Sequence, residues 1–283
     1  MIPEAEEKIS SIAIEAMLHE VGATPKPGLV DRNNSGAHDD MDVFTFFSSI
    51  SVLQPFFTEM AEKGISFKGN DFKKLLKSIR PIGIEAEKRM FAATGGINTH
   101  KGLIFSLGVL SCAAAYQIQK KKPLTAEHIC KRASLMCRDM VKRELIESEK
   151  IQTTGEKLFK ENGVTGIRGE AEAGFPSVIG VSLPYLKKSK GEWNLRLIDT
   201  LLQLMLVVED SNIIGRHNRE TLDIVQNQTK EVLLSGGASD HRGMEILKQL
   251  DLYFIDKNIS PGGSADLLAV TIFLYNIEKL PDK

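Results

Sequence analysis

Several features are scarce in this chain of 283 residues, and each scarcity argues against a class of protein. The 36 basic and 37 acidic residues leave a net charge of -1, which gives no broad electrostatic attraction to nucleic acid or to an anionic membrane. The three cysteines, Cys112, Cys130 and Cys137, are odd in number and lack Cys-x-x-Cys spacing. This pattern disfavours a zinc site or a disulfide framework and predicts buried, inert thiols.

Long apolar runs are also missing. The longest, Leu103 to Tyr116, is shorter than the roughly 20 residues that span a bilayer and is interrupted by Ser106 and Ser111. We therefore expect a buried core helix there and no membrane segment. The N-terminal residues are acidic and lack the basic and apolar regions of a secretory signal, so the cytoplasm is the expected location.

The apolar residues recur with a helical period, as in the stripes within 9–17, 195–208 and 244–254. No alternating stretch bounded by a two-residue hairpin turn competes with this period, so the predicted fold class is all-α. No linker or internal repeat divides the chain, which predicts one domain over 1–283. Further helices are expected over 41–62, 71–93, 99–119, 126–142, 145–161, 176–187, 219–234 and 264–277.

Polar, glycine-rich islands interrupt this helical sequence at 24–32, 36–42, 95–102, 166–170 and 260–266. Glycine and proline let the backbone approach a ligand closely, and the islands carry the Lys, Arg, His and carboxylate groups that bind phosphates and metal ions. Their joint interpretation is one nucleotide-handling site assembled from helix ends.

The first two islands offer a cation and a metal site. Prolines on both sides hold Lys26 in an extended loop, although a rigid loop with an exposed lysine explains the same pattern. His38, Asp40 and Asp42 are part of a cluster richer in acids than helix capping requires, and Mg²⁺ typically takes one or two carboxylates besides waters and phosphates. Glu87, one predicted helix before the island at 95–102, could reach the space of that third island, although a surface position explains it equally well.

The third island resembles a phosphate cradle. Gly95 and Gly96 end one predicted helix, and Asn98 or a neighbour can cap the next, so that free N–H groups point at an anion beside His100 and Lys101. The segment does not match the Walker pattern, which excludes a P-loop.

The remaining islands add an arginine and several acids. Arg168 suits bidentate phosphate contact and Glu170 suits proton transfer, with an exposed Arg–Glu pair on a loop as the alternative. Asp210 and Asn212 follow an apolar helix and mark either a helix stop or the lining of a pocket. Ser264 opens the last helix, either in a second anion site or simply as its cap.

These motifs, taken in order, closely resemble the triphosphoribosyl-dephospho-CoA synthase family over Thr24 to Ala269. The family makes a prosthetic-group precursor for citrate lyase and, in a related branch, for malonate decarboxylase. One departure is Arg216-His217-Asn218, where the family has Arg followed by glycines. The resemblance rests on segments 24–31, 36–42, 98–102, 166–171 and 260–269.

The resemblance implies an all-helical enzyme that joins ATP to 3′-dephospho-CoA. The 2′-hydroxyl of the CoA ribose replaces adenine at C1 of the ATP ribose and leaves the triphosphate intact. Because a β-linked nucleotide gives an α-linked product, direct displacement with inversion is expected.

Roles follow from chemical type. Glu170 is the first choice for the general base and Asp210 the second, and His38 is a candidate acid for adenine departure. Mg²⁺ is expected on Asp40 and Asp42, with Glu87 as a further ligand. The expected substrate contacts are Lys26, Arg32, Asn98, His100, Lys101, Arg168, Asn212 and Ser264.

Other functions fit part of this pattern. The His and Asp clusters alone allow a metal-dependent nucleotide phosphohydrolase, and the helical pattern alone allows a non-catalytic interaction protein. A family paralogue with a different acceptor is a third alternative. For a member of the family, the product is expected to pass to an acyl-carrier protein transferase, and a homodimer is compatible with the sequence.

Overall fold

The computed structural model describes residues 4–147 and 154–280, and every regular element in these two ranges is helical. The predicted all-α class is therefore confirmed, while the middle of the helix expected over 145–161 lies outside the described residues. The elements are α1 (Ala5–Gly22), α2 (Val43–Ser51), α3 (Gln54–Ser66), α4 (Phe72–Ala93), α5 (Lys101–Gln119), α6 (Ala126–Cys137), η1 (Lys142–Ile146), α7 (Thr154–Asn162), α8 (Gly166–Ala173), η2 (Val178–Ser182), α9 (Leu183–Lys188), α10 (Trp193–Val207), α11 (Ser211–Arg216), α12 (Arg219–Leu234), η3 (Gly237–Ser239), α13 (His241–Asp256) and α14 (Gly262–Ile277).

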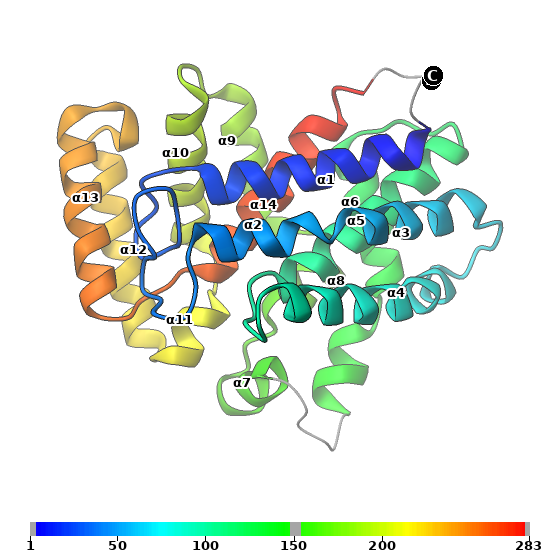
Figure 1. Ribbon diagram of the computed structural model, residues 1–283. Coiled ribbons are helices and arrows are strands. Elements are labelled where there is room, and N and C mark those ends of the chain that lie inside the picture. Colours follow the sequence, from blue (N-terminus) through cyan, green and yellow to red (C-terminus); the bar gives the residue numbers. More distant parts are fainter. Residues whose placement is uncertain (1–3, 148–153, 281–283) are drawn as a thin grey trace.

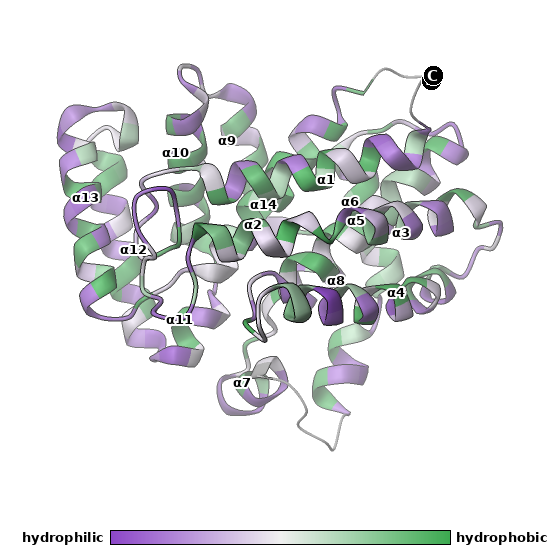
Figure 2. Ribbon diagram, in the orientation of Figure 1, coloured by the Kyte–Doolittle hydropathy of each residue, from purple (hydrophilic) through white to green (hydrophobic). Residues whose placement is uncertain are grey.

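Two apolar helices, α5 and α14, form the centre of the molecule. Most residues of each helix are buried, as expected for helices that are apolar on most sides. They contact each other, and both contact α1, which passes in front of α14 in Figure 1. Helices α12 and α13 pack together at one end, with hydrophilic residues on their outer faces (Figure 2). The core therefore surrounds α5 and α14.

Helix α5 is, within the described ranges, the one helix long and apolar enough to cross a membrane, with a mean hydropathy of 1.4. Inside the protein 78% of that segment is buried. The structure confirms the prediction of a core helix over Leu103 to Tyr116. Cys112, Cys130 and Cys137 are free and buried, and burial raises the pKa of the Cys137 thiol to about 12, as suits an inert thiol.

Three sequence predictions need correction. The helix expected over 126–142 is interrupted, because α6 ends at Cys137 and Asp139 adopts a positive φ of 63° before η1 begins at Lys142. The helix expected over 41–62 is two helices, because the chain bends at Val52 and Leu53 and Pro55 then opens α3, a position where proline is favourable. The segment 166–172, expected to be a turn, is helix α8, which ends where Gly174 adopts a left-handed conformation with φ 81°. Consequently Glu170 and Arg168 project from a helix.

The position of α5 generates a stability prediction. Leu107 in α5 is 0% exposed, so truncation in Leu107→Ala leaves a cavity and should lower the free energy of unfolding by about 2–5 kcal/mol. Leu252→Ala on α13, where the residue is 68% exposed, serves as the control and should change it by less than about 0.5 kcal/mol. Urea denaturation measures both, and equal small effects would contradict the central position of α5.

Candidate active site

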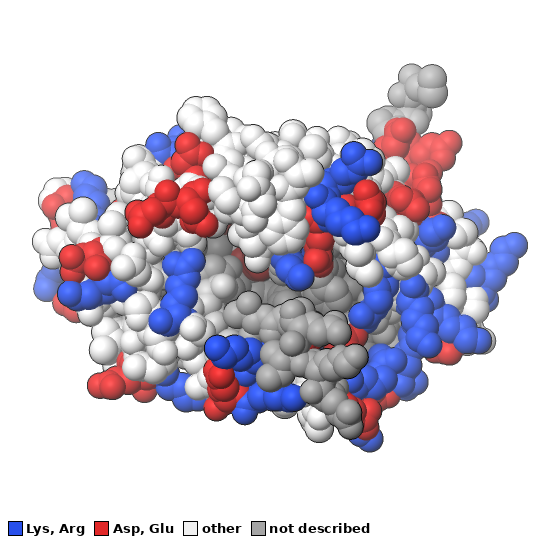
Figure 3. Space-filling view, turned by 60° about the horizontal axis from the view of Figure 1, so that its bottom comes forward, with Lys and Arg blue, Asp and Glu red and all other residues white. Residues whose placement is uncertain are grey.

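A cavity of about 720 Å³ lies where the N-terminal ends of α5, α8 and α14 meet. The loop before α2 and helix α11 complete its walls. One face of the molecule is hollowed near its centre, with Lys and Arg side chains around the hollow (Figure 3). The polar and charged residues of the cavity wall include His38, Asp40, Asn98, Lys101, Glu170, Asn212, Arg216 and Asp266.

The cavity suits an anionic ligand. The first N–H groups of a helix have no acceptor within that helix, and the macrodipole adds positive potential at the same end. Asn98 accepts a hydrogen bond from the N–H of Lys101 at 3.2 Å and so helps to begin α5, as predicted. Lys101 and Arg216 contribute formal positive charge, and Arg216 is held by a 3.2 Å bond to the carbonyl of Ala37.

Asp266 is the most strongly perturbed acid in this wall. Burial raises its pKa well above the ordinary value, and the negative charges of Glu20 and Asp210 raise it further. No described residue donates a hydrogen bond to its carboxylate. Its Oδ2 lies against Gly102 at the start of α5, so closely that a β-carbon there would be 2.4 Å away. Glycine at 102 is therefore required for this approach.

Glu170 faces the same cavity from α8. Burial raises its pKa, and hydrogen bonds from Ser177 partly offset that effect. The Ser177 hydroxyl donates to Oε1 at 2.6 Å. A raised pKa brings a carboxylate closer to neutral pH, where a general base is most effective.

His38 lies at the rim, with Nε2 3.0 Å from the Ser260 hydroxyl and Nδ1 3.3 Å from Arg216. Burial and the charge of Arg216 lower its pKa, and they outweigh the opposing effect of Asp40. The ring is thus neutral at pH 7. The predicted role as an acid is not favoured by this pKa, whereas a hydrogen-bonding role fits.

Asp210 does not line the cavity, and its role differs from the one predicted. The carboxylate is 1% exposed and accepts hydrogen bonds from the N–H groups of Asn212 (3.0 Å), Gly263 (3.2 Å) and Ser264 (2.8 Å), and from the Ser264 hydroxyl (3.0 Å). Its oxygens are occupied by these donors. Asp210 and Ser264 therefore join the starts of α11 and α14, and neither is placed to touch a substrate.

Lys26 is likewise structural. It is 1% exposed, and its Nζ donates to the Glu20 carboxylate at 2.5 Å and to the Glu20 carbonyl at 2.7 Å. Asp31 organises the same loop by accepting bonds from the Thr24 hydroxyl and the N–H of Lys26. The burial of Lys26 does not favour the predicted triphosphate contact, because its ammonium group is enclosed by the protein as well as paired with Glu20.

Two other predicted cations also lie away from the cavity. His100 is buried, is 2.7 Å from the Ser49 hydroxyl through Nδ1, and has its pKa lowered to about 3 by burial and by Lys26. A ring that is neutral and enclosed at pH 7 cannot neutralise phosphate. Arg32 is exposed on another part of the surface, 3.5 Å from the Asn194 side-chain carbonyl.

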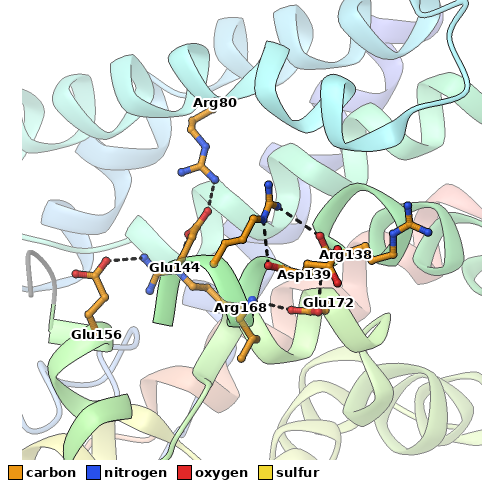
Figure 4. A network of polar contacts seen from close by, with 9 residues as sticks. Arg80, Arg138, Asp139, Glu144, Glu156, Arg168 and Glu172 are labelled. Carbon is orange, nitrogen blue, oxygen red and sulfur yellow. Dashed lines mark hydrogen bonds and ion pairs between the residues drawn. The ribbon is translucent and has the colours of Figure 1, made fainter. Parts of the chain in front are cut away.

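Arg168 points to a second cavity of about 550 Å³. Figure 4 shows it between Glu144 and Glu156, at distances of 3.1 and 3.5 Å, and Arg80 pairs with the same Glu144. The second cavity shares Asn98, Lys101 and other residues with the first. Arg168 thus belongs to the site region, but not to the wall that holds Glu170.

The predicted metal ligands are dispersed. Asp40 lines the first cavity, Asp42 caps α2 through Thr45 at 2.9 Å, and Glu87 pairs with Lys101 at 3.1 Å beside the second cavity. Within 4–147 and 154–280, no three acidic, His or Cys side chains are grouped to hold a metal. The protein therefore has no preformed cage from these three residues, and Asp40 alone faces the cavity.

Sequence reasoning left two residues of this wall out of the site. In the sequence Asp266 is an acid near the start of the last helix, in a segment that the sequence explains either as an anion site or by capping through Ser264. Arg216, the last residue of α11, belongs to the segment Arg216-His217-Asn218 that departs from the family pattern. Its approach to His38 joins residues 178 positions apart, a contact for which the local sequence carries no signal.

One cavity thus brings together helix N-termini, the cations Lys101 and Arg216, and four acids, of which Glu170 and Asp266 have raised pKa values. Such a group of perturbed acids in a cavity marks a candidate active site. The sequence pattern of the family described as CitG: ATP:dephospho-CoA triphosphoribosyl transferase matches residues 6–283. The chain belongs to this family of enzymes. The resemblance inferred from the polar islands is thereby confirmed.

Curated relatives agree with this assignment. The chain is 43% identical over 264 residues to the probable 2-(5''-triphosphoribosyl)-3'-dephosphocoenzyme-A synthase of Lactiplantibacillus plantarum, covering 93% of this chain and 94% of the relative. It is 40% identical to the 2-(5''-triphosphoribosyl)-3'-dephosphocoenzyme-A synthase of Klebsiella pneumoniae, covering 96% and 91%. Protein CitXG of Leuconostoc mesenteroides is 41% identical over 98% of this chain, which spans 61% of that longer protein.

The contrast between the two lysines of the polar islands is testable. Lys26→Ala leaves the buried Glu20 carboxylate unpaired and should lower the free energy of unfolding by about 3–5 kcal/mol. Lys101→Ala, at a partly exposed residue, should leave stability within about 1 kcal/mol and raise the KM for ATP. Urea denaturation and steady-state kinetics measure these effects. A stable Lys26→Ala protein that has lost ATP affinity would restore Lys26 to the binding site.

Proposed function

We propose that the first cavity binds ATP with its Mg²⁺ and that the chain transfers the triphosphoribosyl group to the 2′-hydroxyl of 3′-dephospho-CoA, releasing adenine. The observation that carries this proposal is the meeting of three helix N-termini, Lys101 and Arg216 with two acids of raised pKa in a single cavity. The helix N-termini and the two cations suit a polyphosphate that is bound but not cleaved. The two acids suit proton transfer at the sugar.

The reaction exchanges one bond at C1 of the ATP ribose. The 2′-oxygen of dephospho-CoA forms a bond to C1 while the bond from C1 to adenine N9 breaks, and its electron pair leaves with adenine. The 2′-hydroxyl loses one proton and adenine gains one, so charge and atoms balance. Attack opposite to the leaving base inverts C1 and passes through an oxocarbenium-like transition state, which a nearby carboxylate stabilises.

Asp266 is our proposed general base. Its carboxylate has no hydrogen-bond donor among the described residues, and it lies beside Gly102, where the two cavities share a wall. Glu170 remains a candidate for the same step, but it already accepts the Ser177 hydroxyl. Glu170 suits stabilisation of the positive sugar centre as well.

The triphosphate is proposed to lie at the N-terminal ends of α5 and α8, with Lys101 and Arg216 beside it. Asp40 would hold a Mg²⁺ ion bound to the phosphates, and this ion would neutralise part of their charge; one carboxylate is enough because Mg²⁺ keeps waters and phosphate oxygens as most of its ligands. Asn98 and Asn212 offer amide groups for the sugar or base.

Adenine release tests the function directly. Purified protein with ATP, Mg²⁺ and dephospho-CoA should release adenine, detected by chromatography, in equal amount with the triphosphoribosyl product. Asp266→Asn should lower turnover by about 10²-fold or more while ATP binding is kept. The loss of turnover in Glu170→Gln measures how much Glu170 contributes to the same reaction. Phosphate or pyrophosphate in place of adenine would favour a phosphohydrolase, and no ATP binding at all would favour an interaction protein.

The raised pKa of Asp266 also predicts a pH-dependent stability. An acid whose pKa is higher in the folded than in the unfolded chain stabilises the fold below the unfolded pKa, and this contribution is lost as the pH rises through the folded pKa. Asp266→Asn removes the buried charge, so its Tm should exceed that of the wild type at neutral pH. The gap should close as the pH falls toward about 3.9, the ordinary aspartate value. A lower Tm at neutral pH would contradict a destabilising, charged Asp266.

The context of the reaction is also a proposal. By the resemblance, the product is the precursor of the acyl-carrier prosthetic group of citrate lyase or malonate decarboxylase and passes to a transferase that loads the carrier. A cytoplasmic location and a homodimer stay predictions from the sequence.

A further inference from the structure

The second cavity, of about 550 Å³, is distinct in chemistry from the first. Most of its wall is apolar and comes from α4 and α5, including Ile79, Ile84, Phe91 and Phe105. Ile84 is 50% exposed at this wall, so its apolar side chain is accessible to a ligand in the cavity. At its polar side lie the guanidinium groups of Arg80 and Arg168.

The two cavities meet at one shared wall. Asn98, Lys101, Gly102 and Ile167 line both of them, and the Asp266 carboxylate lies against Gly102 from the side of the first cavity. A reaction that joins two large substrates needs two sites whose contents touch at the reacting atoms. The shared wall beside Asp266 supplies that meeting point.

We propose that the second cavity binds dephospho-CoA, with the pantetheine arm on the apolar wall and the pyrophosphate at Arg80 and Arg168. This inference rests on the proposed function, since it assigns the acceptor of that same reaction. The arm is a chain of methylene and gem-dimethyl groups with two amides, which suits an apolar wall with a few polar groups. The apolar wall offers little to a triphosphate, so the first cavity remains the site of ATP.

Both arginines are paired with carboxylates, but unlike Lys26 they stay accessible, with 50% of the Arg80 side chain and 24% of the Arg168 side chain exposed. Arg80 and Arg168 both contact Glu144, and Arg168 also contacts Glu156 (Figure 4). A guanidinium carries five N–H donors. Among the described residues, Arg80 donates through Nη2 to Glu144, and Arg168 donates through Nε to Glu144 and through Nη2 to Glu156. The carboxylates thus orient the two guanidinium groups and leave N–H donors of each for another acceptor. Bidentate recognition of a phosphate requires two such donors on one guanidinium group.

The test separates the two substrates. Ile84→Glu places a charge where the arm lies and should raise the KM for dephospho-CoA about tenfold while the KM for ATP stays unchanged. Arg80→Gln removes a charged donor to the pyrophosphate and should raise the same constant by about 10-fold to 100-fold. Leu252→Glu, at an exposed apolar residue of α13 that lines neither cavity, is the matched control and should change neither constant.

A probe that carries the arm without adenosine sharpens the result. With the wild type, 4′-phosphopantetheine should inhibit competitively against dephospho-CoA and not against ATP, and Ile84→Glu should weaken that inhibition about tenfold. Competition with ATP, or an unchanged KM for dephospho-CoA in both variants, would overturn the assignment. Calorimetric titration of dephospho-CoA into the wild type and Ile84→Glu tests the site even if no adenine is released, a result that would count against the proposed function alone.

Discussion

The hydrogen bonds to the Asp210 carboxylate are the constraint on which the site depends. They join the first N–H groups of α14 to the start of α11, and a side chain at Gly263 would meet this carboxylate at 3.0 Å. Because α14 is a central helix, fixing its start also fixes where Asp266 stands. The N-terminal ends of α5 and α14 thereby meet at one cavity, and the outer helices need only cover the remaining apolar surface.

The same region concentrates charge that water does not screen. Lys26 and Glu20 form a buried pair, and the negative charge of Glu20 helps to raise the pKa of Asp266. A buried ion pair contributes little net stability, but removing one partner is costly. The arrangement destabilises a charged Asp266 and so makes it a better proton acceptor. Stability is given up at one acid in exchange for reactivity, a common compromise at active sites.

The polar islands illustrate how far residue type can predict a role. Five of the residues that they contributed line one cavity, namely His38, Asp40, Asn98, Lys101 and Glu170. They did not separate binding groups from structural ones. Lys26 and Lys101 look alike in sequence, yet one is enclosed by Glu20 and the other faces both cavities. The difference arises from a contact with the preceding helix, and spacing within a loop does not encode it.

By itself, the sequence determined the helical class, the approximate helices and the family. Apolar periodicity reports which faces must be buried, and long motifs in order are specific to one chemistry. Only the tertiary structure decided which charged side chains face the cavity. It made Asp210 a helix cap and left the Asp266 carboxylate without a hydrogen-bond donor among the described residues. It also placed a second, apolar cavity beside the first. These outcomes depend on burial and on contacts between distant segments, which set hydrogen-bond partners and pKa values and which no local pattern records.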